Sequence, residues 1–205
     1  MELRDAYDQI SVIHAQLAAT ERLRGLRALP VAFSGALALL AATVQSWWID
    51  DPQRDVTRWL SLWVGAAAIS FLAAGCALAH RVRASGSRHS VANAVLALRE
   101  FSPCLLAGAI VTAAVIYRAP GQLWLLPGVW QLLFGLGNLG AHRLLPAPAL
   151  VVGALYFASG TTCLCEFGQD SLDPWAMGLP FAMGQLTLAG ILWWSHERRT
   201  AEVRA

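Results

Sequence analysis

The sequence contains no lysine, and charged residues make up only 14% of its 205 positions, whereas hydrophobic residues make up 57%. So few charged side chains cannot cover the surface of a soluble globular domain, and the mean hydropathy of +0.50 agrees with this exclusion. A formal net charge of +2 also gives no basic patch of the size that nucleic-acid binding needs. The composition therefore favours a membrane protein with no nucleic-acid partner.

Apolar stretches separate the charged clusters, and each has about the 18 to 22 residues that a helix needs to cross a bilayer. Together they predict an all-α, polytopic membrane helical bundle of six transmembrane helices, arranged as three tandem hairpins (29–80, 90–142 and 147–196). The expected spans are 31–49, 59–79, 103–117 (extended backwards by 91–101), 123–141, 147–165 and 175–195. Residues 1–28 precede this transmembrane domain (29–205), which ends in a short tail.

Arginine predicts the orientation, because all 15 basic residues are arginines and twelve of them fall on one side of the expected membrane. These twelve are Arg4, Arg22, Arg24, Arg27, Arg81, Arg83, Arg88, Arg99, Arg143, Arg198, Arg199 and Arg204. The positive-inside rule then places both termini of this multi-pass protein in the cytoplasm. Acidic residues before the first span argue against a cleavable signal peptide.

Aromatic and proline positions suggest an internal repeat. Each even span starts near a tryptophan (Trp59, Trp124, Trp175), where an interfacial belt is expected, and ends near a histidine. Gln131 and Gln185 both stand eleven residues before that histidine. Three duplicated hairpins could pack around a pseudo-threefold axis, although such end signals are common in membrane proteins. Small residues would then permit close approach of the even helices, namely Gly65, Ala68, Gly75, Gly135, Gly137, Gly140, Gly184 and Gly190.

The middles of the spans contain no Asp, Glu, Arg or His, which removes the usual agents of proton-coupled transport and intramembrane acid-base catalysis. Uncharged polar residues remain, and Gln131, Gln185 and Asn138 are the candidate intramembrane binding residues. They could line a polar pocket, or they could simply form hydrogen bonds between helices. No catalytic residue is assigned, because no nucleophile, base and orienting group can be assembled, and no enzyme activity is expected.

Metal and cofactor motifs give weak signals. Cys163 and Cys165 are two residues apart, so on a continuous helix their side chains point away from each other. The GxGxxG string of Gly135, Gly137 and Gly140 closes a predicted transmembrane helix, where helix packing is the better interpretation. We therefore assign no metal site and no cofactor.

An amphipathic helix is predicted before the first span. Leu3, Ile10, Ile13 and Leu17 share one face at three-four spacing, with acidic residues on the other face. Such a helix can lie on the inner leaflet, pack under its own bundle or pair with another protein. These four residues are the candidate partner-binding residues.

Two adjoining segments carry a resemblance to a known group. The segments are AVIYRAPGQLWLLPGVWQLLFGLG (114–137) and AHRLLPAPALVVGALYFASG (141–160). They resemble a group of uncharacterised bacterial integral membrane proteins of about this length. The resemblance implies a location in the bacterial inner membrane and a gene neighbour that encodes a winged-helix transcriptional regulator. It implies no catalytic motif and no functional residues.

The leading functional hypothesis is a nonenzymatic membrane protein that binds or signals to a cytoplasmic partner, such as a regulator, through its N-terminal helix and Arg-rich inner loops. The alternative is a small permease or a membrane protein that binds a lipid or small molecule. The expected partners are the lipid bilayer, a cytoplasmic protein and a second copy of the chain.

Overall fold

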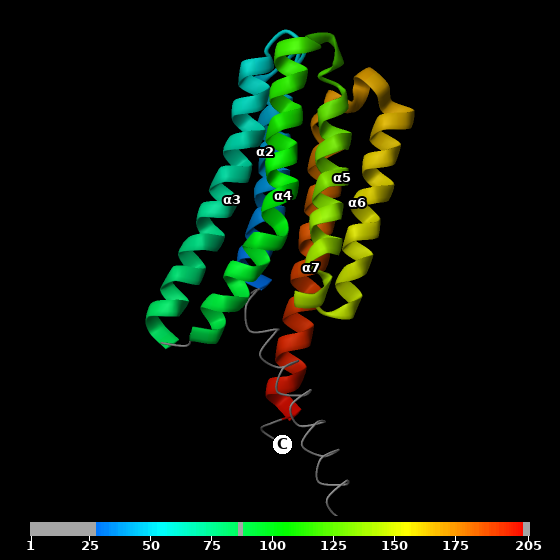
Figure 1. Cartoon of the computed structure of the whole chain (residues 1–205). Coiled ribbons are helices and arrows are strands. Elements are labelled where there is room, and N and C mark those ends of the chain that lie inside the picture. Colours follow the sequence, from blue (N-terminus) through cyan, green and yellow to red (C-terminus); the bar gives the residue numbers. More distant parts are fainter. Residues whose placement is uncertain (1–27, 86–87, 203–205) are drawn as a thin grey trace, which may run out of the picture.

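The fold is all-α in the computed structural model, which describes residues 28–85 and 88–202. Six α-helices run up and down in one bundle (Figure 1). They are α2 (Ala28–Trp48), α3 (Val56–Ser85), α4 (Arg88–Arg118), α5 (Leu125–Gly140), α6 (Leu150–Thr162) and α7 (Pro174–Glu202). Short 3₁₀ or π turns lie at Pro120–Gln122, Ala141–Leu144, Ala147–Ala149, Cys163–Phe167 and Gly168–Leu172. Leu3, Ile10, Ile13 and Leu17 of the predicted amphipathic helix lie outside the described residues.

Five helical segments are long and apolar enough to cross a membrane. They are Ala28–Trp48, Val56–His80, Arg99–Arg118, Ala147–Phe167 and Pro174–Ser195. The fourth expected span corresponds to α5, which has only 16 residues. A helix of that length measures about 24 Å, against about 30 Å for the hydrocarbon core. The architecture therefore fits an integral membrane protein, while the six-span topology stays a prediction.

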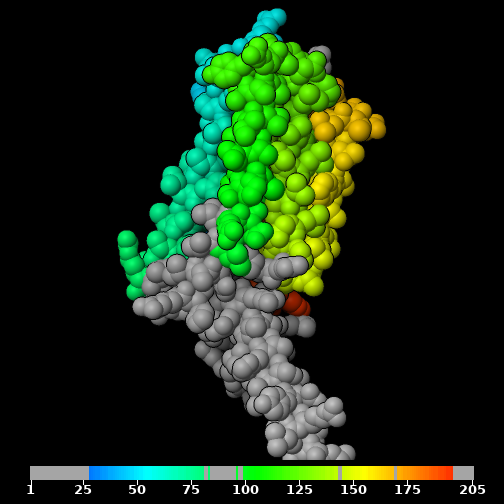
Figure 2. All heavy atoms as spheres, in the orientation of Figure 1, coloured from blue at the N-terminus to red at the C-terminus, as the bar shows by residue number. Residues whose placement is uncertain are grey.

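The helices contact one another in chain order around a ring, and α7 closes the ring by packing against α2. The contacts between α2 and α7 are the most extensive, followed by those between α5 and α6. Contacts between α3 and α4 are the sparsest of the ring. Each of these three interfaces joins two different predicted hairpins. A symmetric threefold repeat would make the three interfaces equally extensive, but they differ, so the packing lacks threefold equivalence. Figure 2 shows α4 on one face of the ring, between α3 and α5.

Glycines allow α5 and α6 to approach closely. Gly128 and Gly135 are seven residues apart on α5, and Gly153 and Gly160 are seven apart on the antiparallel α6. A Cβ added at Gly160 would lie 2.9 Å from the Gly128 carbonyl oxygen, and one added at Gly135 would lie 3.1 Å from the Gly153 carbonyl oxygen. Without a strong hydrophobic driving force between helices in lipid, such backbone-to-backbone packing is a main source of association.

Small residues also line the contact between α2 and α7. Gly35, Ala38, Ala41 and Ala42 are buried on α2. A Cβ added at Gly35 would lie 3.1 Å from the Cβ of Gln185 on α7. The first and last described spans therefore pack through side chains of minimal size.

The remaining glycines do not bring the even spans together as predicted, because those that are packed face a side chain of an odd span. Gly137 packs against the ring of Phe101, and Gly184 packs against the ring of Tyr156. Gly65, Gly75 and Gly190 face open space, with nothing within 4 Å of an added Cβ.

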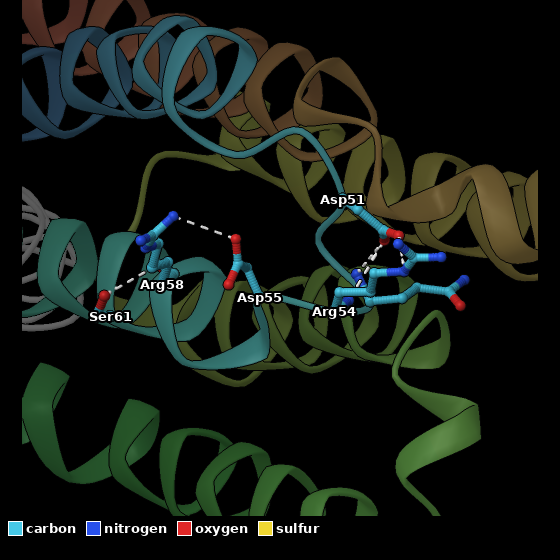
Figure 3. Close-up of polar contacts among 6 residues, drawn as sticks. Asp51, Arg54, Asp55, Arg58 and Ser61 are labelled. Atoms are coloured by element: carbon cyan, nitrogen blue, oxygen red, sulfur yellow. Dashed lines mark hydrogen bonds and ion pairs between the residues drawn. The ribbon is translucent and has the colours of Figure 1, made fainter.

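The two ends of the bundle differ in charge. The aspartate-rich end holds the connections 49–55, 119–124 and 163–173, and the arginine-rich end holds the start of α2 and the end of α7. At the aspartate-rich end, Arg54 Nε lies 3.1 Å from Asp51 Oδ2, and Arg58 Nη1 lies 3.2 Å from Asp55 Oδ2 (Figure 3). Two of the three arginines at this end are thus neutralised locally, which sharpens the charge difference between the ends.

The glycine packing predicts opposite effects of one methyl group at two positions. Gly160→Ala should lower the free energy of unfolding in detergent by about 1–3 kcal/mol, because the new Cβ overlaps the α5 backbone. Gly75→Ala adds the same methyl to open space and should be neutral or slightly stabilising, since alanine is the better helix former. Thermal unfolding followed by circular dichroism compares the two variants. Equal stability of both would contradict the packing.

Candidate functional site in the bundle interior

The buried polar side chains of the described chain are all uncharged. They are Gln45, Gln131, Asn138, Ser171 and Gln185. The three candidate binding residues from the sequence are therefore all inside the bundle, as expected for polar residues in apolar spans. The structure gives them three separate sets of hydrogen-bond partners, and their role in ligand binding stays a prediction.

Gln131 completes the backbone hydrogen bonding of α7. Pro180 lies inside α7 and has no N–H, so the carbonyl of Ala176, four residues earlier, lacks its normal helical donor. The Nε2 of Gln131 on α5 donates to that carbonyl oxygen at 3.0 Å. An unpaired carbonyl is costly away from water. The Gln131 side chain supplies the hydrogen-bond donor that Pro180 lacks.

Pro103 in α4 is accommodated in the same way. Its missing N–H frees the carbonyl of Arg99, and the Ser102 hydroxyl donates to that oxygen at 3.1 Å. Pro103 and Pro180, which lie beyond the first turn of their helices, therefore both have a polar side chain at the carbonyl that they leave without a donor.

Gln185 belongs to an aromatic cluster deeper in the bundle. Its Nε2 donates to the hydroxyl of Tyr156 at 3.3 Å, and that hydroxyl lies 3.4 Å from the Phe181 carbonyl oxygen. The ring of Phe134 packs edge-on against Phe101, Tyr156 and Phe181, with centroids 4.8, 5.1 and 5.3 Å away. Gln185 thus has a different partner type from Gln131, although the two hold matching positions in the predicted repeat.

Asn138 forms a local hydrogen bond. Its Nδ2 donates to the Phe134 carbonyl oxygen of the same helix at 3.1 Å. This bond links no second helix.

Gln45 is a central residue that the sequence analysis missed. Its Nε2 donates to the Leu172 carbonyl oxygen at 2.7 Å, and its Oε1 accepts from Trp63 Nε1 at 2.6 Å. One amide therefore joins α2, α3 and the segment before α7. The signal was present, because Gln45 is a glutamine inside an apolar stretch like Gln131, but it stands only four residues before the expected end of its span at residue 49.

The segment that Gln45 holds is itself buried in the aspartate-rich end. Ser171 donates from its hydroxyl to the Trp124 carbonyl oxygen, and both Ser171 and Leu172 are buried. Gly168 adopts a positive φ of 51°, a conformation that glycine tolerates best, where the π turn changes to a 3₁₀ turn. This connection therefore closes the interior from that end.

Trp59 lies inside the bundle. Its side chain does not face the membrane interface, so the prediction that it belongs to an interfacial belt is wrong. Its side chain is 1% exposed and stacks on Trp130, with ring centroids 5.5 Å apart. Trp130 Nε1 in turn donates to the hydroxyl of Thr112 on α4 at 2.9 Å. By contrast, Trp47, Trp175, Trp193 and Trp194 are exposed, as a belt requires.

Two buried polar atoms of this region have no hydrogen-bond partner among the described residues. They are the Nε1 of Trp59 and the Oε1 of Gln131. One is a donor and the other an acceptor, and both side chains are almost completely buried. Gln131, Trp59, Trp63 and Gln45, which we call the indole-amide cluster, are the candidate functional site. Such a cluster can bind neutral polar groups and supplies no acid, base or nucleophile.

Among the described residues, no group of three or more His, Cys, Asp or Glu could hold a metal ion. No protein-family model, curated protein or solved structure matches this chain.

The Gln45 amide should be a major contributor to stability. Gln45→Leu removes two hydrogen bonds and strands the Trp63 N–H and the Leu172 carbonyl inside the bundle, which should cost about 1–2 kcal/mol of unfolding free energy. The matched control is Thr43→Val on the same helix, whose exposed hydroxyl only bonds its own Leu39 carbonyl. Unfolding of both variants in mixed micelles measures the difference, and a neutral Gln45→Leu would contradict this role.

Proposed function

We propose that this chain is a nonenzymatic integral membrane protein that docks an acidic cytoplasmic protein on its arginine-rich end. One observation supports the proposal above the others. At that end three helices continue beyond their apolar spans, whereas at the aspartate-rich end α2, α3, α4 and α7 begin or end with the span itself.

The extensions add helix beyond the length that spanning the membrane requires. In α4, residues 88–98 precede the span, a length of about 16 Å as a helix. In α7, residues 196–202 follow the span and add about 10 Å. The positive-inside rule requires only that arginines lie near the membrane, in short loops. Helical segments that continue beyond the span can provide a surface for another molecule.

The charge of the extensions indicates the chemistry of the partner. They carry Arg81, Arg83, Arg88, Arg198 and Arg199 against Glu197 and Glu202. A surplus of arginine favours an acidic protein surface, because complementary charge speeds association and excludes basic partners. At the other end, the pairs with Asp51 and Asp55 leave less basic charge to offer.

The sequence resemblance supplies one candidate partner, the winged-helix regulator that it implies. Leu3, Ile10, Ile13 and Leu17 would add an apolar contact next to the arginines. In this proposal the bundle anchors a regulator at the inner leaflet of a bacterial inner membrane.

The proposed orientation has a direct test in a bacterial host. Green fluorescent protein fused after Ala205 should fluoresce, because that reporter matures in the cytoplasm. Alkaline phosphatase inserted between Pro52 and Gln53 should be active, because that enzyme requires the periplasm. The reverse pattern would overturn the orientation.

Partner binding is tested by removing charge at the two ends of the bundle. Arg83→Gln combined with Arg99→Gln removes two exposed cations at the arginine-rich end and should reduce recovery of the partner with the membrane protein about ten-fold. The control is Arg54→Gln combined with Arg118→Gln, which removes two cations at the other end and should change nothing. Recovery is measured by quantitative mass spectrometry after mild crosslinking in native cells.

Deletion of residues 1–26 forms a third arm of that experiment, and it should also abolish recovery. Equal recovery from all variants would contradict docking at the arginine-rich end.

A further inference from the structure

We propose that the indole-amide cluster binds one hydroxyl group, from a buried water or from a small neutral alcohol, between Trp59 Nε1 and Gln131 Oε1. This site is independent of the docking at the arginine-rich end. The case starts from the two unpartnered atoms, because buried polar groups in folded proteins nearly always have a hydrogen-bond partner.

The two atoms lie in one layer of the bundle. Gln131 reaches the carbonyl of Ala176 in the first turn of α7, and Gln45 reaches the carbonyl of Leu172 one turn earlier. Trp63, which bonds Gln45, stands one helical turn from Trp59 on α3. The ring of Trp59 stacks on Trp130, the neighbour of Gln131 on α5. Both unpartnered atoms therefore belong to the same buried layer near Leu172 and Ala176.

The remaining hydrogen-bonding capacity defines the ligand. The indole N–H can only donate, and an amide oxygen can only accept. The missing group must therefore accept one hydrogen bond and donate another, which a hydroxyl or water does. A carboxylate lacks the donor and an ammonium lacks the acceptor.

The surroundings also exclude a charged ligand. The buried core cluster that contains Trp59 and Trp63 is otherwise apolar and includes Leu126, Met177 and Ala42. No charged side chain is buried among the described residues, so an ion there would lack a counter-charge. Water or a short alcohol satisfies both atoms without that cost.

A double-mutant cycle on the full chain in nanodiscs tests whether one group bridges the two side chains. Trp59→Phe keeps an aromatic ring and removes the N–H, and Gln131→Leu removes the amide. If a hydroxyl joins them, the effect of both changes together on the unfolding equilibrium should differ from the product of the single effects by about five-fold. A product that matches the double variant overturns the proposal. Trp63→Phe with Gln131→Leu is the control pair and should show no coupling, because Trp63 bonds Gln45 instead.

Nuclear magnetic resonance on ¹⁵N-tryptophan-labelled wild-type protein identifies the source of the hydroxyl and does not depend on the variants folding well. The Trp59 indole signal, assigned by its loss in Trp59→Phe, should show a cross-relaxation peak to water when water is the bridge. If glycerol or ethanol is the better ligand, its addition should shift that signal and leave the Trp63 indole signal in place. A Trp59 indole N–H with no contact to water or to added alcohol would overturn the proposal.

Discussion

Satisfaction of every backbone polar group without water is the constraint on which this bundle depends. In an apolar solvent a carbonyl without a donor is costly, yet prolines lie inside α4 and α7. The chain meets the constraint with uncharged side chains. Ser102 covers the carbonyl freed in α4, and Gln131 covers the one freed in α7. Gln45 covers Leu172, just before α7 begins. Gln45 and Gln131 therefore complete hydrogen bonding at irregular backbone, whereas Gln185 bonds the Tyr156 hydroxyl instead.

The positions of the helices could be predicted because they follow from the length of each apolar run in the sequence. The length of an apolar run fixes where a helix lies, so the helices fall close to the expected spans, and polar residues inside those runs are buried. What the sequence did not show is which element lies opposite which. Gln131 and Pro180 are far apart in the chain, and only their proximity reveals that one serves the other. The sequence position of Trp59 predicts an interfacial residue, and only its stacking on Trp130 shows that the side chain is buried in the bundle.

The glycines also show that the sequence does not reveal which elements lie opposite each other. A glycine permits close approach, but it does not specify a neighbour. Gly128 and Gly160 meet backbone to backbone, whereas Gly65 and Gly75 meet nothing within 4 Å. The difference lies in the partner helix, because α5 and α6 present glycines to each other and α3 has no such counterpart. The same property leaves α3 and α4 as the loosest neighbours in the ring.

The closing contact between α2 and α7 also sets an order of events during biosynthesis. The small-residue face of α2 enters the membrane early, but its partner is synthesised only after residue 174. At bacterial and eukaryotic translation rates of about 5–20 residues per second, α2 waits roughly 6–25 s for α7. During that interval its alanine and glycine face must contact lipid, the translocation machinery or a chaperone. A ribosome that stalls before α7 thus leaves an intermediate in which α2 can pack against α3 while its small-residue face lacks its final partner.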